Sequence, residues 1–284
     1  MDSSRLHDRR AFLRTAAGIA AGAMLAPLRS LRAETAAPIL RAQRLAWAGI
    51  RLQLPTGTLF LDPLIDTNVW GPALKDAMIP VDDATGDRFV LITHRHPDHC
   101  DPQAIRAALG DTGTLVYAAS AGVPSVAGVK LRAAPMYEPL LLGDFTATAV
   151  PAVDGYGDPQ VSWIVSAGGR RIIHCGDTLW HGAWWQIGRQ YGPFDAAFLP
   201  INGARFRWRK PYSEVPAVMT AEQAVAAAVV IGARTIVPIH YGMRGAEGYE
   251  EDPDAEKELV TFGRERGVGV EIVKPGAWID WRQG

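Results

Sequence analysis

Cysteine and histidine are both scarce in this sequence of 284 residues. Only Cys100 and Cys175 are present, which excludes a small scaffold framed by several disulfides. The pair leaves a disulfide, thiolate ligands or two buried and inert cysteines open, and burial is the interpretation we favour. Histidine occurs seven times, so a cluster of histidines within one short stretch is informative.

Long hydrophobic runs are also missing beyond the N-terminus, where none approaches the roughly 20 residues that a membrane-spanning helix needs. Neither a repeat of fixed period nor a low-complexity tract nor an internal linker interrupts the chain. Apolar residues make up 48% of the sequence and charged residues 21%, which is typical of a globular protein. We therefore expect one domain over residues 34–284.

The N-terminus has the features of an export signal. The paired arginines Arg9 and Arg10 precede the small, weakly apolar run 15–27. A basic start, an apolar stretch and a small-residue exit are typical of a secretory signal, and the arginine pair resembles the twin-arginine motif. We expect residues 1–33 to be a twin-arginine-type signal peptide, with Ala36 as the alternative end, and a periplasmic location. A membrane-anchoring amphipathic helix is the other interpretation.

Positive and negative charges are nearly balanced, because 29 basic and 30 acidic side chains give a net charge of −1. Residues 1–33 contain six of the basic and two of the acidic side chains, so the remaining 23 basic and 28 acidic residues carry a net charge of −5. A mildly acidic body disfavours nucleic-acid binding, which requires a basic surface. We expect a small-molecule substrate, anionic ones included, with no nucleic-acid partner and no stable membrane span after processing. The oligomeric state stays open.

One short stretch concentrates the polar chemistry of the chain. Three histidines and one carboxylate fall within six residues, namely His94, His96, Asp98 and His99. They follow the apolar run 89–92, which has the composition of a short buried strand. Neutral imidazole binds borderline metals such as zinc, and a carboxylate adds charge. Because such groups are costly to bury unpaired, the stretch predicts a metal site rather than a solvated polar turn.

Three further candidate ligands share one type of position, in the loop just past an apolar strand: Asp154, Asp177 and His240. Strand ends are rigid, and side chains placed there can converge on one point, which a preorganised metal site requires. His174 lies three residues before Asp177 and within a strand, so we expect a packed or hydrogen-bonded histidine there.

Hydrophobic patterning predicts a mixed α/β protein in which sheets pack together. Asp101 and Thr220 have the residue type and the sequence context of helix N-caps. We expect strands over 50–54, 58–62, 89–92, 114–117, 196–199, 236–239, 268–273 and 277–281, hairpins over 139–150 and 160–175, and helices over 102–109, 220–231 and 254–266.

These residues resemble the motifs of a known family, the metallo-β-lactamase superfamily. Three motifs carry the resemblance: His-x-His-x-Asp-His at 94–99, Gly176-Asp177-Thr178, and Pro238-Ile-His240-Tyr-Gly. More narrowly, four segments resemble the branch that contains ascorbate-6-phosphate lactonase and N-acyl-phosphatidylethanolamine phospholipase D: Trp47-Ala-Gly, Asp62-Pro63, Leu199-Pro-Ile-Asn-Gly203 and Met219-Thr-Ala-Glu222. The resemblance spans about residues 44–274. It implies a four-layer αββα sandwich with two metals at one edge.

The resemblance also implies a ligand set for two divalent metal ions, with Zn expected and Mn or Fe as alternatives. It assigns the first metal to His94 and His96, the second to Asp98, His99 and His240, and a bridging position to Asp177. A bridging carboxylate and a bridging hydroxide would screen the repulsion between two dications about 3.5–4 Å apart.

One position departs from the family pattern. After Val-Pro-Ala the family supplies a third histidine to the first metal, whereas this chain has Asp154. A carboxylate binds zinc and also suits the harder Mn and Fe. We favour Asp154 as a ligand, with a solvent-facing loop residue as the alternative.

The expected reaction is hydrolysis of a small ester, lactone or related bond by a metal-bridging hydroxide. Asp98 and Asp177 are the expected catalytic residues, with Asp98 orienting the nucleophile and carrying a proton. Phosphodiesterase or phospholipase-like hydrolysis is the alternative. A non-catalytic binding or sensing protein follows if the Asp154 side is defective. A di-iron oxidoreductase is less favoured, because those relatives resemble a pattern with Glu in place of His96.

Four residues near the predicted ligands are candidate substrate contacts: Trp180, His181, Asn202 and Arg205. Each has a structural alternative. Trp180 shares a helical face with Trp184, which is the pattern of core packing. His181 suits the capping of a helix, and the basic loop 205–210 is either a solvated segment or a clamp for phosphate or carboxylate.

Overall fold

The computed structural model describes residues 39–281, all within one compact unit that spans Ala37–Gly284. The signal peptide predicted over residues 1–33 lies outside the described residues. Among the described helices, none combines the length and the apolar character that crossing a membrane would require.

The first sheet has six strands in sequence order: β1 (Arg41–Arg44), β2 (Ile50–Leu54), β3 (Gly57–Leu61), β4 (Asp87–Ile92), β5 (Thr114–Ala118) and β6 (Lys130–Ala134). Strands β1 to β3 are antiparallel, and β3 to β6 are parallel. Strand β6 is absent from the sequence prediction because four of its five residues are exposed, so it has no apolar run. Parallel pairing places the loops after β4 and β5 at the same edge of the sheet.

The second sheet has seven strands in the order β15 (Gly269–Val270), β13 (Ala233–Ile239), β11 (Phe194–Pro200), β10 (Arg170–His174), β9 (Val161–Ala167), β8 (Phe145–Pro151) and β7 (Leu140–Leu142). Both predicted hairpins are confirmed, because β7 pairs with β8 and β9 with β10 in antiparallel register. Strands β10, β11, β13 and β15 are parallel. A separate two-stranded ribbon joins β12 (Arg205–Phe206) to β14 (Tyr249–Glu250).

Within residues 39–281 four α-helices complete the fold: α1 (Pro102–Leu109), α2 (Trp184–Tyr191), α3 (Ala221–Ile231) and α4 (Ala255–Arg266). Both predicted N-caps are confirmed. The Asp101 carboxylate accepts the backbone N–H groups of residues 103 and 104. Thr220 and Gln223 form a reciprocal capping box at the start of α3. These caps satisfy donors that the first turn of a helix would otherwise leave without partners.

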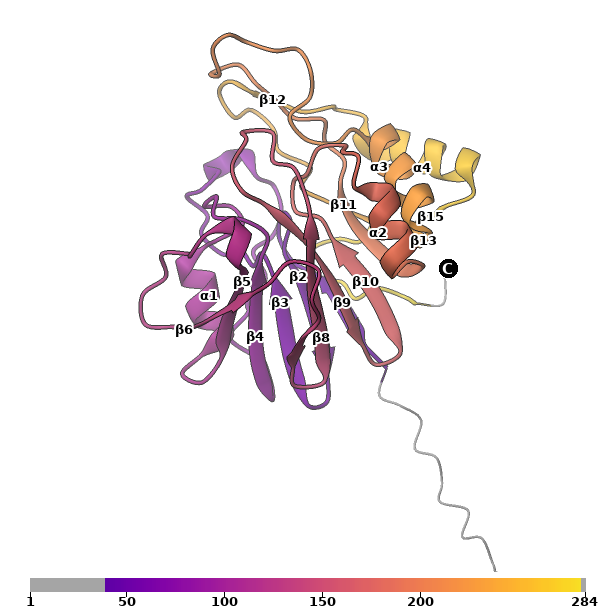
Figure 1. Cartoon of the computed structure of the whole chain (residues 1–284). Helices are drawn as coiled ribbons and strands as arrows, with labels where there is room; N and C mark the ends of the chain where they lie inside the picture. The colour runs from indigo at the N-terminus through magenta and orange to yellow at the C-terminus, as the bar shows by residue number, and fades with distance from the viewer. Residues whose placement is uncertain (1–38, 282–284) are drawn as a thin grey trace, which may run out of the picture. The chain divides into compact units, whose positions relative to one another are not determined.

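Three buried clusters define four layers, which confirms the predicted αββα sandwich (Figure 1). Residues such as Leu91 of β4 and Phe198 of β11 meet between the sheets. Helix α1 covers the outer face of the first sheet through Ile105. Helices α2, α3 and α4 cover the outer face of the second sheet, where Val225 and Leu259 are buried. Successive side chains of a strand point to opposite faces of its sheet, so apolar strands are buried on both faces and the layers follow.

The end of the chain corrects the sequence prediction. Of the strand expected over 268–273 only Gly269–Val270 forms, and the strand expected over 277–281 is reduced to one bridge between Trp278 and Gln43. Alternating apolar residues suggested longer strands. The turn at Gly276, whose φ is +86°, brings the chain alongside β1 for only a short distance.

The two sheets are joined directly beside the histidine stretch. The indole Nε1 of Trp163 on β9 donates to the carbonyl of Ile92 at the end of β4, at 2.7 Å. The backbone N–H of Val161 donates to the carbonyl of Thr93 at 3.1 Å. These bonds fix the start of the 94–99 loop, which belongs to the first sheet, against a strand of the second.

Candidate metal centre

The predicted ligands lie in loops at one edge of the sandwich. Residues 94–99 follow β4, Asp154 follows β8, Asp177 follows β10 and His240 follows β13. All seven side chains are buried except His96, which is 26% exposed. The structure therefore brings together residues that are far apart in the sequence, and it collects them into three groups of potential ligand atoms.

The first group contains His94, His99 and Asp177, whose ligand atoms all lie within 4.8 Å of one another. Nε2 of His94 is 3.8 Å from Oδ1 of Asp177 and 2.9 Å from Nδ1 of His96. Two imidazole nitrogens and one carboxylate oxygen thus face a common point. This is a donor set that zinc accepts.

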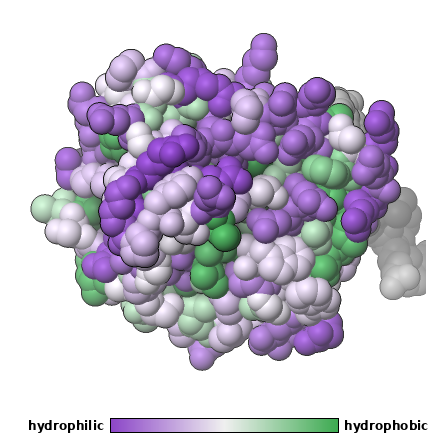
Figure 2. Space-filling model, turned by 90° about the horizontal axis from the view of Figure 1, so that it is seen from above, coloured by the Kyte–Doolittle hydropathy of each residue, from purple (hydrophilic) through white to green (hydrophobic). Residues whose placement is uncertain are grey.

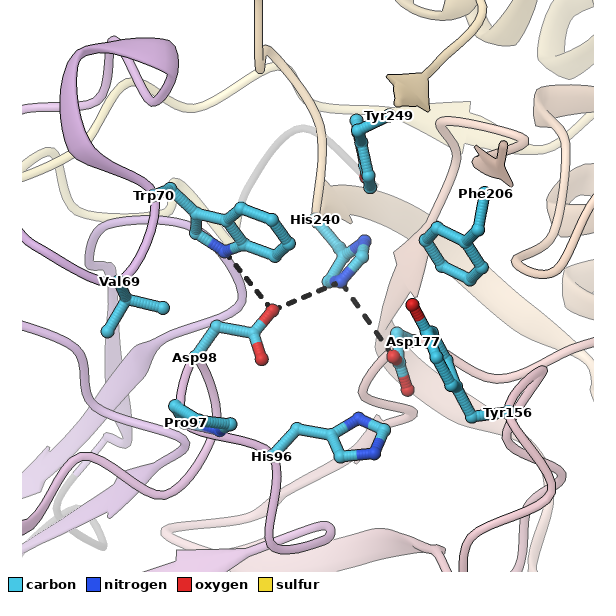
Figure 3. A pocket seen from close by; sticks show the side chains of 10 residues that line it. All are labelled: Val69, Trp70, His96, Pro97, Asp98, Tyr156, Asp177, Phe206, His240 and Tyr249. Carbon is cyan, nitrogen blue, oxygen red and sulfur yellow. Dashed lines mark hydrogen bonds and ion pairs between the residues drawn. The ribbon is translucent and has the colours of Figure 1, made fainter. Parts of the chain in front are cut away.

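The second group contains Asp98, His99 and His240, again within 4.8 Å. Oδ2 of Asp98 lies 3.7 Å from Nε2 of His99 and 3.9 Å from Nε2 of His240. The other oxygen of Asp177, Oδ2, is 3.9 Å from Nε2 of His240. Because its two oxygens face histidines of different groups, Asp177 is placed to bridge them. Figure 3 shows the contact of Asp177 with His240.

Hydrogen bonds to Nδ1 of His99 and of His94 determine which ring nitrogen of each carries the proton. Asp62 Oδ2 accepts from His99 Nδ1 at 2.8 Å and from the Thr93 hydroxyl at 2.7 Å. The hydroxyl has only one proton to donate, so Thr93 Oγ1 accepts from Nδ1 of His94 at 2.9 Å. In its neutral form each ring therefore turns an unprotonated Nε2 toward the carboxylates, which is the tautomer that metal binding needs.

The electrostatics of the centre suit a cation. Burial alone would lower the pKa of His99, but the carboxylates of Asp98, Asp62 and Asp177 raise it to about 10. Nε2 of His99 and Oδ1 of Asp177 are buried without a hydrogen-bond partner among residues 39–281. A dication at this point would neutralise the carboxylates and satisfy both atoms, so the residues present fit the metals that the sequence predicts.

Two other histidines are neutral because they are buried. Burial lowers the pKa of His94 well below its usual value and that of His240 to about 3. A neutral imidazole is the form that binds a metal, so burial keeps both side chains ready as ligands.

Backbone strain is concentrated around the same residues. Trp47, Asp62 and His240 have φ values of +58°, +44° and +55°, in a region that side chains other than glycine rarely adopt. The ring centroids of Trp47 and His240 are 4.1 Å apart, and the carbonyl of Trp47 accepts the backbone N–H of His240 at 3.2 Å. Such strain persists where surrounding contacts enforce it, as is common at functional sites.

Two indoles hold the carboxylate of Asp98. Nε1 of Trp47 donates to Oδ2 of Asp98 at 3.0 Å, and Nε1 of Trp70 donates to the same atom at 3.3 Å. Trp47 belongs to a motif that the sequence singled out, whereas Trp70 lies in a long loop with no signal beyond its composition. The pair fixes the orientation of a predicted catalytic residue.

Asp154 lies beside His96. Its Oδ2 is 3.6 Å from Nε2 of His96, and it forms the third group of potential ligands with His96 and Asp158. Burial, followed by the charge of Asp177, raises the pKa of Asp154. Asp158 is closer to Nε2 of His96, at 2.9 Å, and no motif in the sequence singles it out. A ligand role for Asp154 stays a prediction.

A cavity of about 400 Å³ opens over the centre. It is lined by Val69, Trp70, His96, Pro97, Asp98, Tyr156, Asp177, Phe206, His240 and Tyr249 (Figure 3). Four of these rings form a continuous series that we call the aromatic arc: Trp70, Tyr249, Phe206 and Tyr156. Successive centroids along it are 5.4, 5.8 and 4.6 Å apart. The cavity therefore combines histidine and carboxylate side chains on one side with an apolar wall on the other.

The candidate substrate contacts lie elsewhere among the described residues, because none of the four lines this cavity. Trp180 packs against the core of α2 and α3, and His181 stacks on Trp184 with centroids 4.3 Å apart. Asn202 is fully buried behind the site and donates to Oη of Tyr249 at 2.6 Å. Arg205 donates to the carbonyls of residues 203 and 214.

His174 and the two cysteines have the structural roles that the sequence analysis favours. Nε2 of His174 donates to the carbonyl of Ala48 at 2.7 Å within the core, as expected of a packed strand histidine. Cys100 and Cys175 are buried free thiols, and burial raises the pKa of each to about 12. Neither thiol is poised to act as a nucleophile.

The end of the sandwich on which Figure 2 looks is mostly hydrophilic, with apolar residues confined to small separate patches. The ribbon β12–β14, which carries Phe206 and Tyr249 of the aromatic arc, lies at this end (Figure 1). The apolar part of the site is therefore recessed in a cavity rather than spread over the surface.

Known proteins resemble this chain in sequence and in fold. Residues 58–241 match the family model of the Beta-lactamase superfamily domain. A UPF0173 metal-dependent hydrolase of Rubrobacter xylanophilus is 30% identical over an alignment 261 residues long, and the match covers 83% of this chain and 94% of that protein.

Two solved structures illustrate the fold. Igni18, a metallo hydrolase from Ignicoccus hospitalis, is 20% identical with a TM-score of 0.62, covering 84% of this chain and 97% of its own. CmlA, a diiron β-hydroxylase from Streptomyces venezuelae, is 14% identical with a TM-score of 0.64, covering 85% of this chain and 54% of its own. At these identities the likeness is one of fold.

Proposed function

Because this chain belongs to the β-lactamase superfamily and is a metal-dependent hydrolase, we propose that it cleaves the ester or lactone bond of a small substrate that carries an apolar group. The observation that carries the proposal is the cavity, in which the aromatic arc faces the histidine and carboxylate groups. Within the narrower branch that the sequence resembles, the lactonase supports a lactone, whereas the phospholipase D cleaves a phosphodiester and supports the alternative.

We assign the metal ligands as the sequence predicts. His94, His96, Asp98, His99, Asp177 and His240 would hold two divalent ions, with zinc favoured by the number of imidazole donors. When bound, such ions activate water and polarise the substrate oxygen. Asp154 is the proposed additional donor on the His96 side, from its distance of 3.6 Å.

Asp98 and the aromatic arc have separate roles in the proposed reaction. The carboxylate of Asp98, whose Oδ2 is held by the two indole N–H groups, orients the attacking water and receives its proton on the other oxygen. The aromatic arc binds the apolar part of the substrate and excludes bulk water, which strengthens the electrostatic interactions within the cavity.

The lining favours a neutral substrate over a phosphodiester. Among the described lining residues no lysine or arginine is present. The arginines of the basic loop have other partners, since Arg207 pairs with Glu250 and the Arg209 guanidinium lies 3.7 Å from the centroid of the Tyr156 ring. A phosphate clamp formed by this loop is therefore not supported by its contacts. The acyl group of an ester or lactone matches the apolar wall better.

The test compares three probes on metal-loaded protein: an aryl ester, an aryl-substituted lactone and a bis-aryl phosphate. We expect turnover of the first two, loss of turnover on chelation, and recovery on adding Zn²⁺. The control is Asp98→Asn, in which metal content and hydrolysis are measured on the same sample. Exclusive turnover of the phosphate probe, or hydrolysis that survives chelation, would overturn the proposal.

We also propose export of the protein to the periplasm through residues 1–33. The arginine pair Arg9 and Arg10 and the apolar run behind it support this proposal. Replacing both arginines with lysine should retain the protein in the cytoplasm of its bacterial host, as measured by fractionation of the full chain. Unchanged periplasmic recovery of that variant would argue against the twin-arginine route.

A further inference from the structure

The outer side of His96 is in contact with a carboxylate. Nδ1 of the ring lies 2.9 Å from Nε2 of His94, on the side of the proposed metals. Nε2, on the opposite side, lies 2.9 Å from Oδ2 of Asp158. A carboxylate accepts and does not donate, so the proton of the ring is on Nε2 and the lone pair of Nδ1 faces His94.

The loop that carries Asp158 is built by Asp154. Oδ1 of Asp154 accepts the backbone N–H of Tyr156 at 2.8 Å, and its Oδ2 accepts that of Asp158 at 3.2 Å. Both carboxylate oxygens of Asp154 thus bind the backbone of the loop that follows it. This bonding explains how an aspartate occupies the position where the family pattern has a histidine.

Close packing fixes the same loop on its other side. A Cβ added to Gly155 would lie 2.0 Å from the carbonyl oxygen of Ala217, so the backbone of the loop is pressed against the segment before α3. The guanidinium of Arg209 donates to the carbonyl of Tyr156 at 3.1 Å and covers the Tyr156 ring. The side chain of Asp158 is 59% exposed, yet its backbone N–H is held by Asp154.

We propose that Asp158 is a positioning residue for the metal centre, which orients His96 from behind so that Nδ1 of the ring faces the first metal. The inference rests on the proposed function, since it assumes that His96 is a ligand. Asp154 acts indirectly in this arrangement by shaping the loop that presents Asp158.

The physical basis is the general behaviour of ligand histidines. A carboxylate on the second nitrogen selects the tautomer, restrains the ring and raises the basicity of the nitrogen that binds the metal. Asp62 does this for His99 in the buried part of the centre. Asp158 does it for His96, the ligand that is otherwise most exposed and least restrained.

The alternative is direct ligation by Asp158, because its carboxylate belongs to the third group of potential ligand atoms, with His96 and Asp154. The two roles differ in what the loss of the side chain changes. Loss of a positioning residue weakens binding but leaves the number of bound ions unchanged at saturation. Loss of a ligand lowers that number.

The experiment measures Zn²⁺ affinity by competition with a chromophoric chelator, and metal content at saturation, on the purified full chain without substrate. We expect Asp158→Ala to weaken the tighter binding phase by about 10–100-fold, with unchanged content and unchanged stability of the metal-free protein. Asp158→Asn, which keeps an acceptor oxygen without the charge, should fall between Ala and wild type. Asp111→Ala removes another exposed carboxylate, after α1, and is the control for charge.

Each other outcome has a defined meaning. Equal affinity of Asp158→Ala and Asp111→Ala overturns the inference while leaving the proposed function intact. Lower metal content of Asp158→Ala overturns positioning in favour of ligation, and lower stability of its metal-free form reduces Asp158 to a structural residue. Failure of the wild-type protein to bind Zn²⁺ at all would instead count against the proposed function.

Discussion

Oδ2 of Asp62 accepts the Nδ1 proton of His99 at 2.8 Å, and both side chains are completely buried. Burial raises the pKa of Asp62, but the hydrogen bond with His99 and the charge of that ring outweigh burial and hold the pKa below its usual value. An ionised carboxylate in this position is tolerated because the histidine, the Thr93 hydroxyl and the Thr93 backbone N–H all donate to it. The pair connects the end of β3 to the metal centre.

Asp62→Asn should therefore weaken metal binding without removing a ligand. The amide can present its N–H₂ group to His99 and so favour the wrong tautomer, which we expect to lower Zn²⁺ affinity about 10–100-fold. Chelator competition measures the effect, with Asp111→Asn as the control for loss of one charge. Wild-type affinity in Asp62→Asn would mean that the His99 tautomer is fixed by other groups.

Asp177→Asn should reduce the number of metals bound. The two oxygens of this carboxylate face His94 and His240, which belong to different groups, so replacing it with a weak ligand removes the bridge. We expect metal content to fall from about two equivalents per chain to about one or fewer, and the rise in Tm on adding Zn²⁺ to shrink. Elemental analysis and thermal unfolding at matched metal concentration check this, and undiminished content would remove Asp177 from the ligand set.

Phe206→Ala should impair substrates that carry a ring more than small ones. The side chain contributes to the aromatic arc and contacts both Tyr156 and Tyr249. We expect KM for an aryl ester to rise about tenfold, or about 1.4 kcal/mol, with kcat nearly unchanged, because the contact is made equally in the ground and transition states. Trp185→Ala, which truncates an exposed indole on α2, is the matched control. A fall in kcat with unchanged KM would contradict a binding role.

His181→Phe should stabilise the protein, and increasingly so at low pH. Both ring nitrogens of His181 are buried without a hydrogen-bond partner among the described residues, and burial lowers the pKa from 6.5 to about 4. The unfolded chain therefore binds a proton more tightly, so the contribution of His181 to stability is complete above pH 6.5 and is lost as pH falls towards 4.

At neutral pH we expect Phe to add about 1 kcal/mol by removing two unsatisfied polar atoms while keeping the stack on Trp184. Urea unfolding of both proteins in chelator, from pH 7 to pH 4 at constant ionic strength, measures the free energy of unfolding. A difference that stays constant with pH would show that His181 does not titrate in this range.

The residues that the sequence identified well are those whose signal is local. The spacing of His94 to His99 after an apolar run predicts a metal site without knowledge of any distant residue, and strand ends predict the approach of Asp177 and His240. The αββα sandwich follows from the same motifs by resemblance, and the clusters on both faces of each sheet confirm it.

The residues that the sequence missed are those defined by tertiary contact. Trp70 in a loop and Tyr249 on β14 are far apart in the chain, and only the fold shows that their rings are 5.4 Å apart. Asp158 is one of many exposed acidic residues until its distance to His96 is known. Conversely, Trp180 and His181 follow Asp177 closely in sequence, but the turn after β10 directs them toward α2.

The potential metal ligands of the centre come from segments that are far apart in the sequence. His94 follows a strand of the first sheet and His240 the last long strand of the second, so they meet only after large loops have closed. Loop closure costs entropy before such contacts form, and folds rich in distant pairings reach the native state slowly. We therefore expect a metal ion to find its complete set of donors only at the end of folding. Its binding energy should then appear mainly as slower unfolding, so that the lifetime of the folded protein would depend on the metal supply.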